Sequence, residues 1–254
     1  MFNQLKTTAV LTLLTFSSPA MALDIDLDNM SGAEKDAFGQ LVRHYILDNP
    51  DIIMDAFRIL EQRQEIADLH ADTTLIAENL QSIQQDGFSW EGGNPDGDVT
   101  LVEFLDYKCG YCRKAHDEVA SLVANDGNIR LIVKEYPILS EDSLNLSRAA
   151  VATLQSLGPD AYKKMHDLFI SYNGPVTNDA ISFLAKKAGL DAPRIVAMMD
   201  EPSVDGQIGK IRQLGQTLNV SGTPTFIFND QIVRGYVPED SMKQIVAELR
   251  AQTQ

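Results

Sequence analysis

The chain has 254 residues, of which 44% are hydrophobic and 22% are charged. This composition is typical of globular proteins and excludes the disordered class, which combines low hydrophobicity with high net charge. The 36 acidic residues outnumber the 21 lysines and arginines, and the formal net charge is -15. Such a surface repels phosphate backbones on average, so we expect no nucleic-acid partner.

Residues 1–22 have the pattern of a cleaved secretory signal peptide. Lys6 is the only charged residue before the apolar run Ala9–Phe16, and the segment ends in Pro19-Ala20-Met21-Ala22. The alternative is a membrane anchor, which needs roughly 20 apolar residues. The run here is shorter, and no later segment approaches that length. We therefore expect cleavage after Ala22 and a mature chain without a membrane span.

Residues 23–86 are expected to form a helical extension of two helices. Ser31-Gly32-Ala33-Glu34 fits a capping box for the first helix, and Asp48-Asn49-Pro50 interrupts the pattern. Asn49 is expected to cap the second helix, with Pro50 in its first turn. The second helix carries a narrow apolar seam. Two interpretations stay open: the seam packs on the protein's own main domain, or, as we favour, it joins copies of the chain. The seam residues are Ile53, Phe57, Leu60, Ile66, Leu69, Ile76, Leu80 and Ile83.

Residues 87–254 are expected to form one α/β domain. The Gly92–Gly97 cluster predicts a turn, and a strand, a helix and a second strand follow it as a β-α-β unit. Several helical stretches from about residue 143 to 219 then form an inserted helical block. A hairpin around Asn229-Asp230 and a final helix complete the domain. The expected elements are strands 99–106, 129–135, 225–228 and 232–235, and helices 111–124 and 238–251.

The two cysteines of the chain, Cys109 and Cys112, lie where the first predicted strand meets its helix. Backbone N–H groups and the helix dipole favour a thiolate at the helix N-terminus. Cys109 is therefore expected to be exposed and nucleophilic, whereas Cys112 faces inward and closes the short disulfide. A static disulfide is one alternative, but so short a loop restrains little chain entropy. The other alternative is that the two thiols form half of a metal site shared between two chains.

The segment Val102–Cys112, with the sequence VEFLDYKCGYC, resembles the active-site strand and helix of the thioredoxin superfamily in its DsbA-like periplasmic branch. A second motif, Val220–Thr225 with the sequence VSGTPT, is similar to the loop that holds a cis-proline against the active-site sulfurs in that superfamily. The resemblance spans about residues 88–254. It implies a thioredoxin-like α/β fold with a helical insertion, preceded by the N-terminal helical extension, and a periplasmic location.

The resemblance also implies roles for single residues. Glu103 corresponds to a buried acid that exchanges a proton with the resolving cysteine, and Lys134 on the next strand is a candidate partner for it. An exposed strand carboxylate is the alternative. Thr223 and a cis Pro224 are expected to leave a backbone edge open to an extended substrate. An ordinary trans turn proline is the alternative there.

The dipeptide Gly110-Tyr111 bears on the direction of the redox reaction and borders the expected substrate site. It places no histidine beside Cys109, so the thiolate is expected to be less stabilised than in strongly oxidising relatives. The Cys-Gly-Tyr-Cys motif and the threonine before the cis-proline resemble DsbC-type isomerases. Together with the N-terminal extension, they resemble ScsC-like proteins, which are associated with suppression of copper sensitivity.

Our first interpretation is a periplasmic oxidoreductase that isomerises or reduces protein disulfides. Its expected partners are misfolded or cysteine-containing proteins, a membrane redox partner and other copies of the chain. A dithiol oxidase, and a non-catalytic chaperone or copper-handling protein, are the alternatives. The histidines are dispersed, and His116, four residues after Cys112, is interpreted as a helix-surface residue rather than a metal ligand. We expect no metal site and no cofactor.

Overall fold

The computed structural model describes residues 29–252, so the expected signal peptide (residues 1–22) lies outside the described residues. The chain divides into two compact units, residues 1–61 and 62–254. Among the described residues, no helix has the length and apolar character needed to cross a bilayer.

The N-terminal unit contains helix α1 (Gly32–Asp48) and the beginning of helix α2 (Asp51–Gln84). The expected capping box is confirmed, because Ser31 Oγ accepts from the backbone N–H of Glu34 and the Glu34 carboxylate accepts from the backbone N–H of Ser31 at 2.8 Å. Asn49 differs from expectation. Its side-chain amide and its backbone N–H both donate to Tyr45 O, at 2.9 and 3.0 Å, so it closes the end of α1.

Large apolar side chains of this unit lie at the surface of the single chain. No residue of α1 is buried, although a helix with apolar residues on several turns normally buries them. The exposed group includes Phe38, Leu41, Val42, Tyr45, Leu47, Ile52, Ile53, Met54, Phe57, Ile59 and Leu60.

The second unit is built on a five-stranded sheet with the strand order β1-β3-β2-β4-β5. Strands β2 and β3 are parallel, and the other three pairings are antiparallel. This confirms the predicted β-α-β unit and the hairpin, with β2 at the centre of the sheet. The strands are β1 (Trp90–Gly93), β2 (Val99–Leu105), β3 (Ile129–Glu135), β4 (Thr225–Phe228) and β5 (Gln231–Arg234).

Edge strand β1 is absent from the sequence-based prediction, which assigned Gly92 and Gly93 to a turn. The strand pairs with β3, Trp90 lying opposite Val133. A side chain at Gly92 would collide with the indole ring of Trp90. Glycine at this position therefore lets the ring fold over its own strand. Two glycines in four residues leave no alternating pattern from which a strand is predicted.

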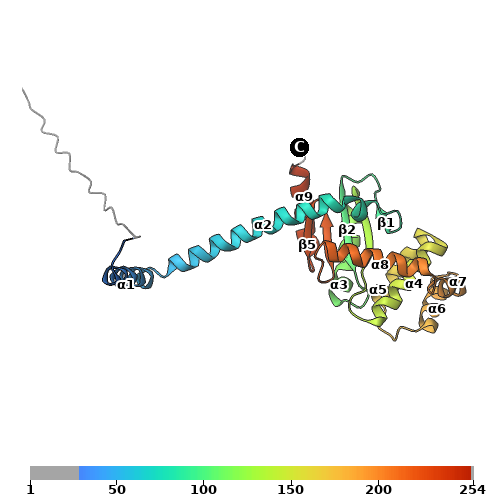
Figure 1. Cartoon of the computed structure of the whole chain (residues 1–254). Coiled ribbons are helices and arrows are strands. Elements are labelled where there is room, and N and C mark those ends of the chain that lie inside the picture. Colours follow the sequence, from blue (N-terminus) through green and yellow to red (C-terminus); the bar gives the residue numbers. More distant parts are fainter. Residues whose placement is uncertain (1–28, 253–254) are drawn as a thin grey trace, which may run out of the picture. The chain divides into compact units, whose positions relative to one another are not determined.

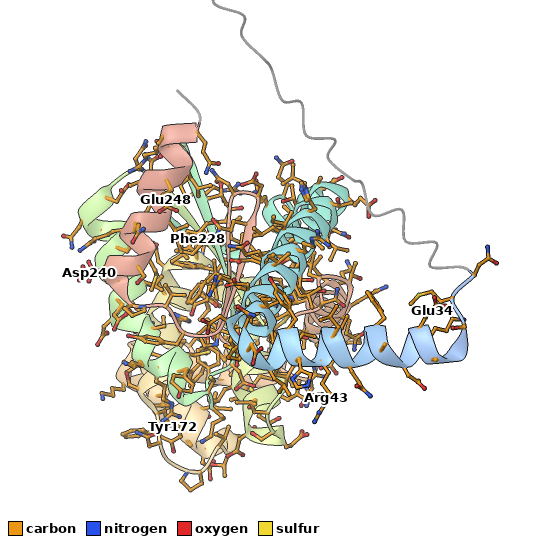
Figure 2. The ribbon with its side chains drawn as sticks, turned by 90° about the vertical axis from the view of Figure 1, so that its left-hand side faces the viewer. Glu34, Arg43, Tyr172, Phe228, Asp240 and Glu248 are labelled. Carbon is orange, nitrogen blue, oxygen red and sulfur yellow. The ribbon has the colours of Figure 1, made fainter. Side chains whose placement is uncertain are left out.

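Helices cover both faces of the sheet (Figure 1). The helical insertion is confirmed, and its helices α4–α7 gather away from α9 (Figure 1). Helix α9 exposes Asp240 and Glu248 (Figure 2) and buries Met242 and Val246. The helices of the unit, after the end of α2, are α3 (Gly110–Asp126), α4 (Glu141–Leu157), α5 (Pro159–Ser171), α6 (Asn178–Lys187), α7 (Ala192–Met198), α8 (Pro202–Thr217) and α9 (Glu239–Gln252).

The C-terminal part of α2 contributes to the core of the second unit. Ile76 and Ile83, at 2% and 0% exposure, pack in one cluster with Phe104 of β2 and Ile211 of α8. Asp72 adds an ion pair of 2.6 Å with Arg234 of β5. The apolar seam of α2 is thus divided: Ile76 and Ile83 pack on the chain's own sheet, whereas the seam residues before residue 70 remain exposed.

Candidate active site

The two cysteines lie where strand β2 passes into helix α3. Asp106, at 0% exposure, shapes this turn. One of its carboxylate oxygens accepts from the backbone N–H of Lys108 at 2.8 Å, and the other accepts from the N–H groups of Ile138 and Leu139 at 2.9 and 3.0 Å. This buried carboxylate, which the sequence reasoning did not single out, ties the turn to the segment after β3 and thereby sets the position of Cys109.

Cys109 is the N-cap residue of α3, with an extended backbone (φ -77°, ψ 119°). The side chain was expected to be exposed, but the residue is only 7% exposed, compared with 1% for Cys112. The loop after α8 covers it, and the protonated Cys109 thiol donates to the carbonyl oxygen of Thr223 at 3.0 Å. Both cysteines are free thiols, and Cys109 is the more accessible of the two.

The two thiols differ strongly in acidity. The pKa of Cys109 is lowered to about 5, chiefly by the hydrogen bond from the Cys112 thiol and also by the backbone N–H groups of Cys112 and Tyr111, which together outweigh burial. Burial, the bond to Cys109 and the charge of Glu103 raise the pKa of Cys112 above its usual value. At neutral pH the pair therefore holds a thiolate at Cys109 and a thiol at Cys112.

Glu103 lies in the centre of β2 at 5% exposure, so the alternative of an exposed carboxylate does not hold. Burial, with further repulsion from Glu135 and Cys109, raises its pKa to about 8. No hydrogen bond reaches its carboxylate from any residue in the range 29–252. Lys134, the candidate partner, lies opposite Phe104 in the register and binds Asp86 at 2.6 Å instead. Successive residues of a strand point to opposite faces, which puts Lys134 on the other side of the sheet.

The loop before β4 lies against the active-site sulfur. The Thr223–Pro224 peptide bond is cis, as the sequence motif predicted. The hydroxyl of Thr223 is buried and makes no hydrogen bond to any described residue. Gly110 has open space where a side chain would project, and Tyr111 is 63% exposed and stacks on Tyr236 with 6.1 Å between ring centroids. The structure thus brings the predicted site residues to one place.

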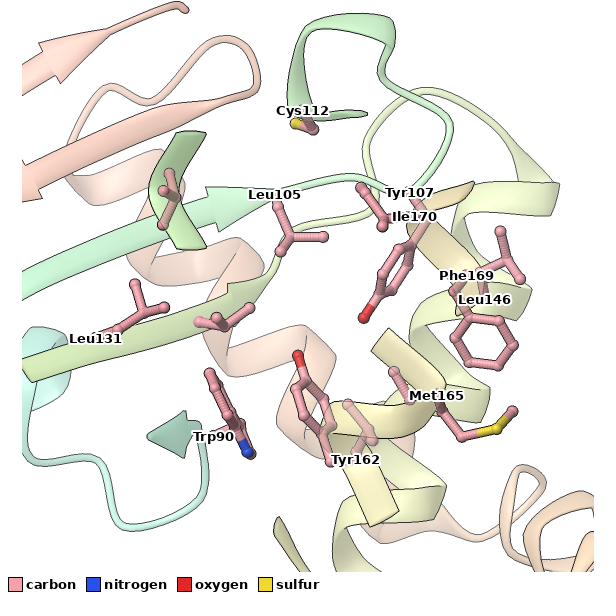
Figure 3. Close-up of a cluster of buried hydrophobic side chains, with 14 of the residues drawn as sticks. Trp90, Leu105, Tyr107, Cys112, Leu131, Leu146, Tyr162, Met165, Phe169 and Ile170 are labelled. Carbon is pink, nitrogen blue, oxygen red and sulfur yellow. The ribbon is translucent and has the colours of Figure 1, made fainter. Parts of the chain in front are cut away.

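A second buried carboxylate, Glu135 at the end of β3, lies on the same face of the sheet as Glu103. It accepts hydrogen bonds from Tyr107 at 2.7 Å, Tyr162 at 2.6 Å and Ser147 at 2.7 Å. The two tyrosine hydroxyls point into the same space (Figure 3). Burial raises the pKa of Glu135 to about 7, although these three bonds oppose the rise. Sequence reasoning missed this network because its members come from three elements and the turn between β2 and α3, which are far apart in the sequence.

A cavity of about 300 Å³ opens beside Glu103. Its polar wall is formed by Glu103, His116, Lys163 and His166, and its apolar wall includes Trp90. This volume holds several water molecules, each of which occupies roughly 30 Å³ in the liquid. Water in the cavity can therefore exchange protons with the buried acid.

The fold and the site together define a dithiol protein with a thioredoxin-type strand, Cys-x-x-Cys helix and cis-proline loop. The family profile described as Thioredoxin matches residues 53–248. The chain belongs to this thioredoxin family. A second profile, described as the Copper resistance protein ScsC N-terminal domain, matches residues 34–67.

Solved structures of similar proteins agree with this assignment. A thioredoxin-like oxidoreductase from Silicibacter pomeroyi DSS-3 is 36% identical, with a TM-score of 0.63 over 67% of this chain and 97% of that one. The thiol-disulfide exchange protein alpha-DsbA2 from Wolbachia pipientis is 28% identical, with a TM-score of 0.67 over 72% and 98%. Proteus mirabilis ScsC, in a transitional conformation, shares the fold at 22% identity and a TM-score of 0.64 over 89% and 99%.

Among curated proteins, similarity extends to part of a much longer chain. Na(+)/H(+) antiporter NhaA 3 from Salinispora tropica is 27% identical over 54% of this chain and 21% of its own length. This chain therefore spans about a fifth of that relative.

Proposed function

We propose that the protein is a periplasmic thiol-disulfide oxidoreductase that isomerises or reduces disulfides of substrate proteins through Cys109 and Cys112. The observation that carries thiol-disulfide exchange is the division of acidity between the two sulfurs, and the choice of isomerisation rests on the N-terminal unit. The pKa of Cys109 is lowered to about 5, and that of Cys112 is raised. A thiolate that is partly accessible attacks a disulfide, whereas a buried thiol waits until the first sulfur has reacted.

In the first step, the Cys109 thiolate attacks one sulfur of a substrate disulfide. A mixed disulfide forms, and the other substrate sulfur leaves as a thiolate. In isomerisation, that thiolate attacks a second substrate disulfide, and a substrate thiolate finally displaces Cys109 from the mixed disulfide. The redox state of the protein is unchanged, and its pair must stay reduced between cycles.

In reduction, Cys112 completes the reaction. Ionised Glu103 takes the proton of Cys112, and the new thiolate attacks Cys109 Sγ, so the second substrate sulfur leaves. The substrate disulfide gains two electrons and the Cys109–Cys112 pair loses them. A pKa of about 8 suits Glu103 to this exchange, because the acid holds or releases a proton near neutral pH. A membrane redox partner would then return two electrons to the pair.

The cis-proline loop supplies the proposed substrate edge. An extended substrate segment beside Cys109 can pair with the backbone of Thr223, as strands are added to exposed sheet edges. The buried Thr223 hydroxyl, which has no partner among the described residues, is available to the substrate. Tyr111, exposed beside Cys109, offers an aromatic surface to the same segment.

The N-terminal unit supports isomerisation over simple reduction. Its exposed apolar residues, which include Leu41, Tyr45, Met54, Phe57 and Leu60, form the kind of surface that marks a protein interface. We propose that this surface joins copies of the chain. An oligomer presents several Cys109 thiolates to one misfolded substrate and shields them from the enzymes that recharge oxidases.

A dithiol oxidase is the second candidate, and the acidity of Cys109 favours it. A stabilised thiolate favours the reduced form of the pair, which makes its disulfide more oxidising. A pKa of about 5 lies between the values of about 7 for thioredoxin and about 3.5 for DsbA. The acidity alone therefore supports either direction of electron flow.

Refolding of scrambled ribonuclease, measured beside oligomer mass by light scattering, tests the proposal. We compare residues 23–254 with residues 62–254, a truncation that keeps Ile76 and Ile83 in the core. The longer chain is expected to be oligomeric and to isomerise, and the shorter chain to be a folded monomer that retains dithiol oxidation. Cys109→Ser in the longer chain is the inactive control. Equal isomerisation by both chains, or a monomeric longer chain, would contradict the proposed role of the N-terminal unit.

A further inference from the structure

Two histidines that are fifty residues apart in the sequence meet beside the cavity. His116 lies on α3, and His166 and Asp167 lie on α5. One donor atom from each of the three residues lies within 4.8 Å of the others. The imidazole centroids are 5.0 Å apart, and His116 Nε2 is 3.2 Å from an Asp167 oxygen. We propose that His116, His166 and Asp167 form a binding site for a divalent transition-metal ion of the Zn²⁺ type, separate from the two cysteines.

The hydrogen bonds around His166 leave it suited to coordinate a metal. The Tyr107 hydroxyl donates its single proton to Glu135 at 2.7 Å, so His166 Nδ1, at 3.0 Å from the same hydroxyl, must donate to Tyr107. Nε2 of His166 is then unprotonated and keeps its lone pair. Metal-bound histidines usually donate their second ring N–H to such a partner, which orients the ring. The Tyr107–Glu135 pair supplies this support.

The chemistry of the three donors also suits a metal. Two imidazole nitrogens and one carboxylate oxygen form a common donor set for Zn²⁺.

The three donors leave room for a fourth ligand. His116 and His166 line the cavity of about 300 Å³, and a water molecule within it can complete a tetrahedral site. Zn–N bonds of about 2.0–2.1 Å require ligand atoms about 3.3 Å apart, so the most widely separated donors must approach one another by up to about 1.5 Å. The side chains of His116 and Asp167, at 18% and 42% exposure, have the freedom to make this adjustment.

Lys163 now neutralises the carboxylate of the site. Its Nζ donates to both oxygens of Asp167 at 2.6 Å. A cationic group therefore already lies where the proposed ion would bind. The Lys163 side chain is 44% exposed, and its flexible stem allows the ammonium to turn into solvent. Lys163 should compete with the metal, so its removal should strengthen binding.

Binding of Co²⁺ and Zn²⁺ to the full mature chain carrying Cys109→Ser and Cys112→Ser tests the site without thiol ligands. Trp90 is the single tryptophan of the chain and lines the same cavity, with its ring centroid 6.4 Å from that of His166. Co²⁺ bound at the site should quench Trp90 fluorescence, whereas Co²⁺ on the acidic surface should not. We expect saturable quenching at one Co²⁺ per chain and competition by Zn²⁺.

Matched variants locate the ion. His116→Ala and Asp167→Asn should each weaken Co²⁺ binding at least about tenfold. Lys163→Gln should tighten Co²⁺ binding about threefold. The exposed controls His70→Ala and Asp160→Asn should leave Co²⁺ binding unchanged. Circular dichroism establishes that each variant is folded. The proposal is overturned if Trp90 shows no saturable quenching up to about 1 mM Co²⁺, or if quenching is insensitive to both His116→Ala and Asp167→Asn. Weaker binding by Lys163→Gln would also overturn it, because Lys163 would then support the ion rather than compete with it.

Discussion

Replacing Glu103 by glutamine should stabilise the protein by an amount that grows with pH. The folded protein holds this carboxyl at a pKa of about 8, against a reference value of 4.5. Between these two values the folded state keeps a proton that the unfolded state has released, so stability falls by about 1.4 kcal/mol for each pH unit gained. Glutamine cannot ionise, and it removes this dependence.

The size of the effect follows from the pH window. Between pH 5 and pH 8 the difference in unfolding free energy between Glu103→Gln and the wild type should grow by about 4 kcal/mol at most. Reduced protein is unfolded in urea at both pH values and followed by circular dichroism. Both proteins carry the same other titratable groups, so the effect of those groups on the unfolding free energy largely cancels when the two proteins are compared. Glu65→Gln, on the exposed side of α2, is the control and should show no growth. A difference that grows by less than about 1 kcal/mol would refute the inference that Glu103 is protonated in the folded state.

Three further outcomes follow from the same structure. The rate at which iodoacetamide modifies Cys109 should rise with pH around a midpoint near pH 5, and Cys112 should stay unmodified through neutral pH. The Cys112→Ala variant should accumulate mixed disulfides with substrates. If Cys109→Ala traps substrates instead, Cys112 is the attacking thiol and Cys109 the resolving one. Lys134→Met should lower stability by about 3–5 kcal/mol in urea unfolding, because it leaves the Asp86 carboxylate, whose side chain is only 9% exposed, without its ammonium partner. Adding Asp86→Leu should restore part of that loss, and an unchanged midpoint in the single variant would show that the pair contributes nothing.

Features set by short-range pattern were predicted well. The capping box at Ser31, the strand 129–135 and the hairpin at Asn229 each depend on residues within a few positions of one another. The Cys-x-x-Cys motif and the Thr223-Pro224 motif belong to the same class, since each is read within a single segment. Their agreement with the structure reflects turn, cap and periodicity rules that act locally.

The exposure of Cys109 was predicted less well. A helix N-terminus does favour the thiolate, but the residue is only 7% exposed because a loop more than a hundred residues later covers it. The lowered pKa depends chiefly on the Cys112 thiol and on the backbone N–H groups of Cys112 and Tyr111, which lie within three residues of Cys109. The sequence motif therefore places the groups that lower this pKa, whereas the loop that covers the sulfur is a feature of the tertiary structure.

Apart from strand β1, the sequence by itself determined the order of the strands, and it placed the two cysteines, the acid on the central strand and the proline beside them, because each is encoded in a local pattern or motif. Only the tertiary structure decided which charged groups meet. The parallel register puts Glu103 opposite Val133, so Lys134 faces the other side of the sheet and pairs with Asp86. The packing of α5 beside α3 brings His166 to His116. Strand register and helix packing are properties of the whole core, and a one-residue change in either would give these side chains different partners.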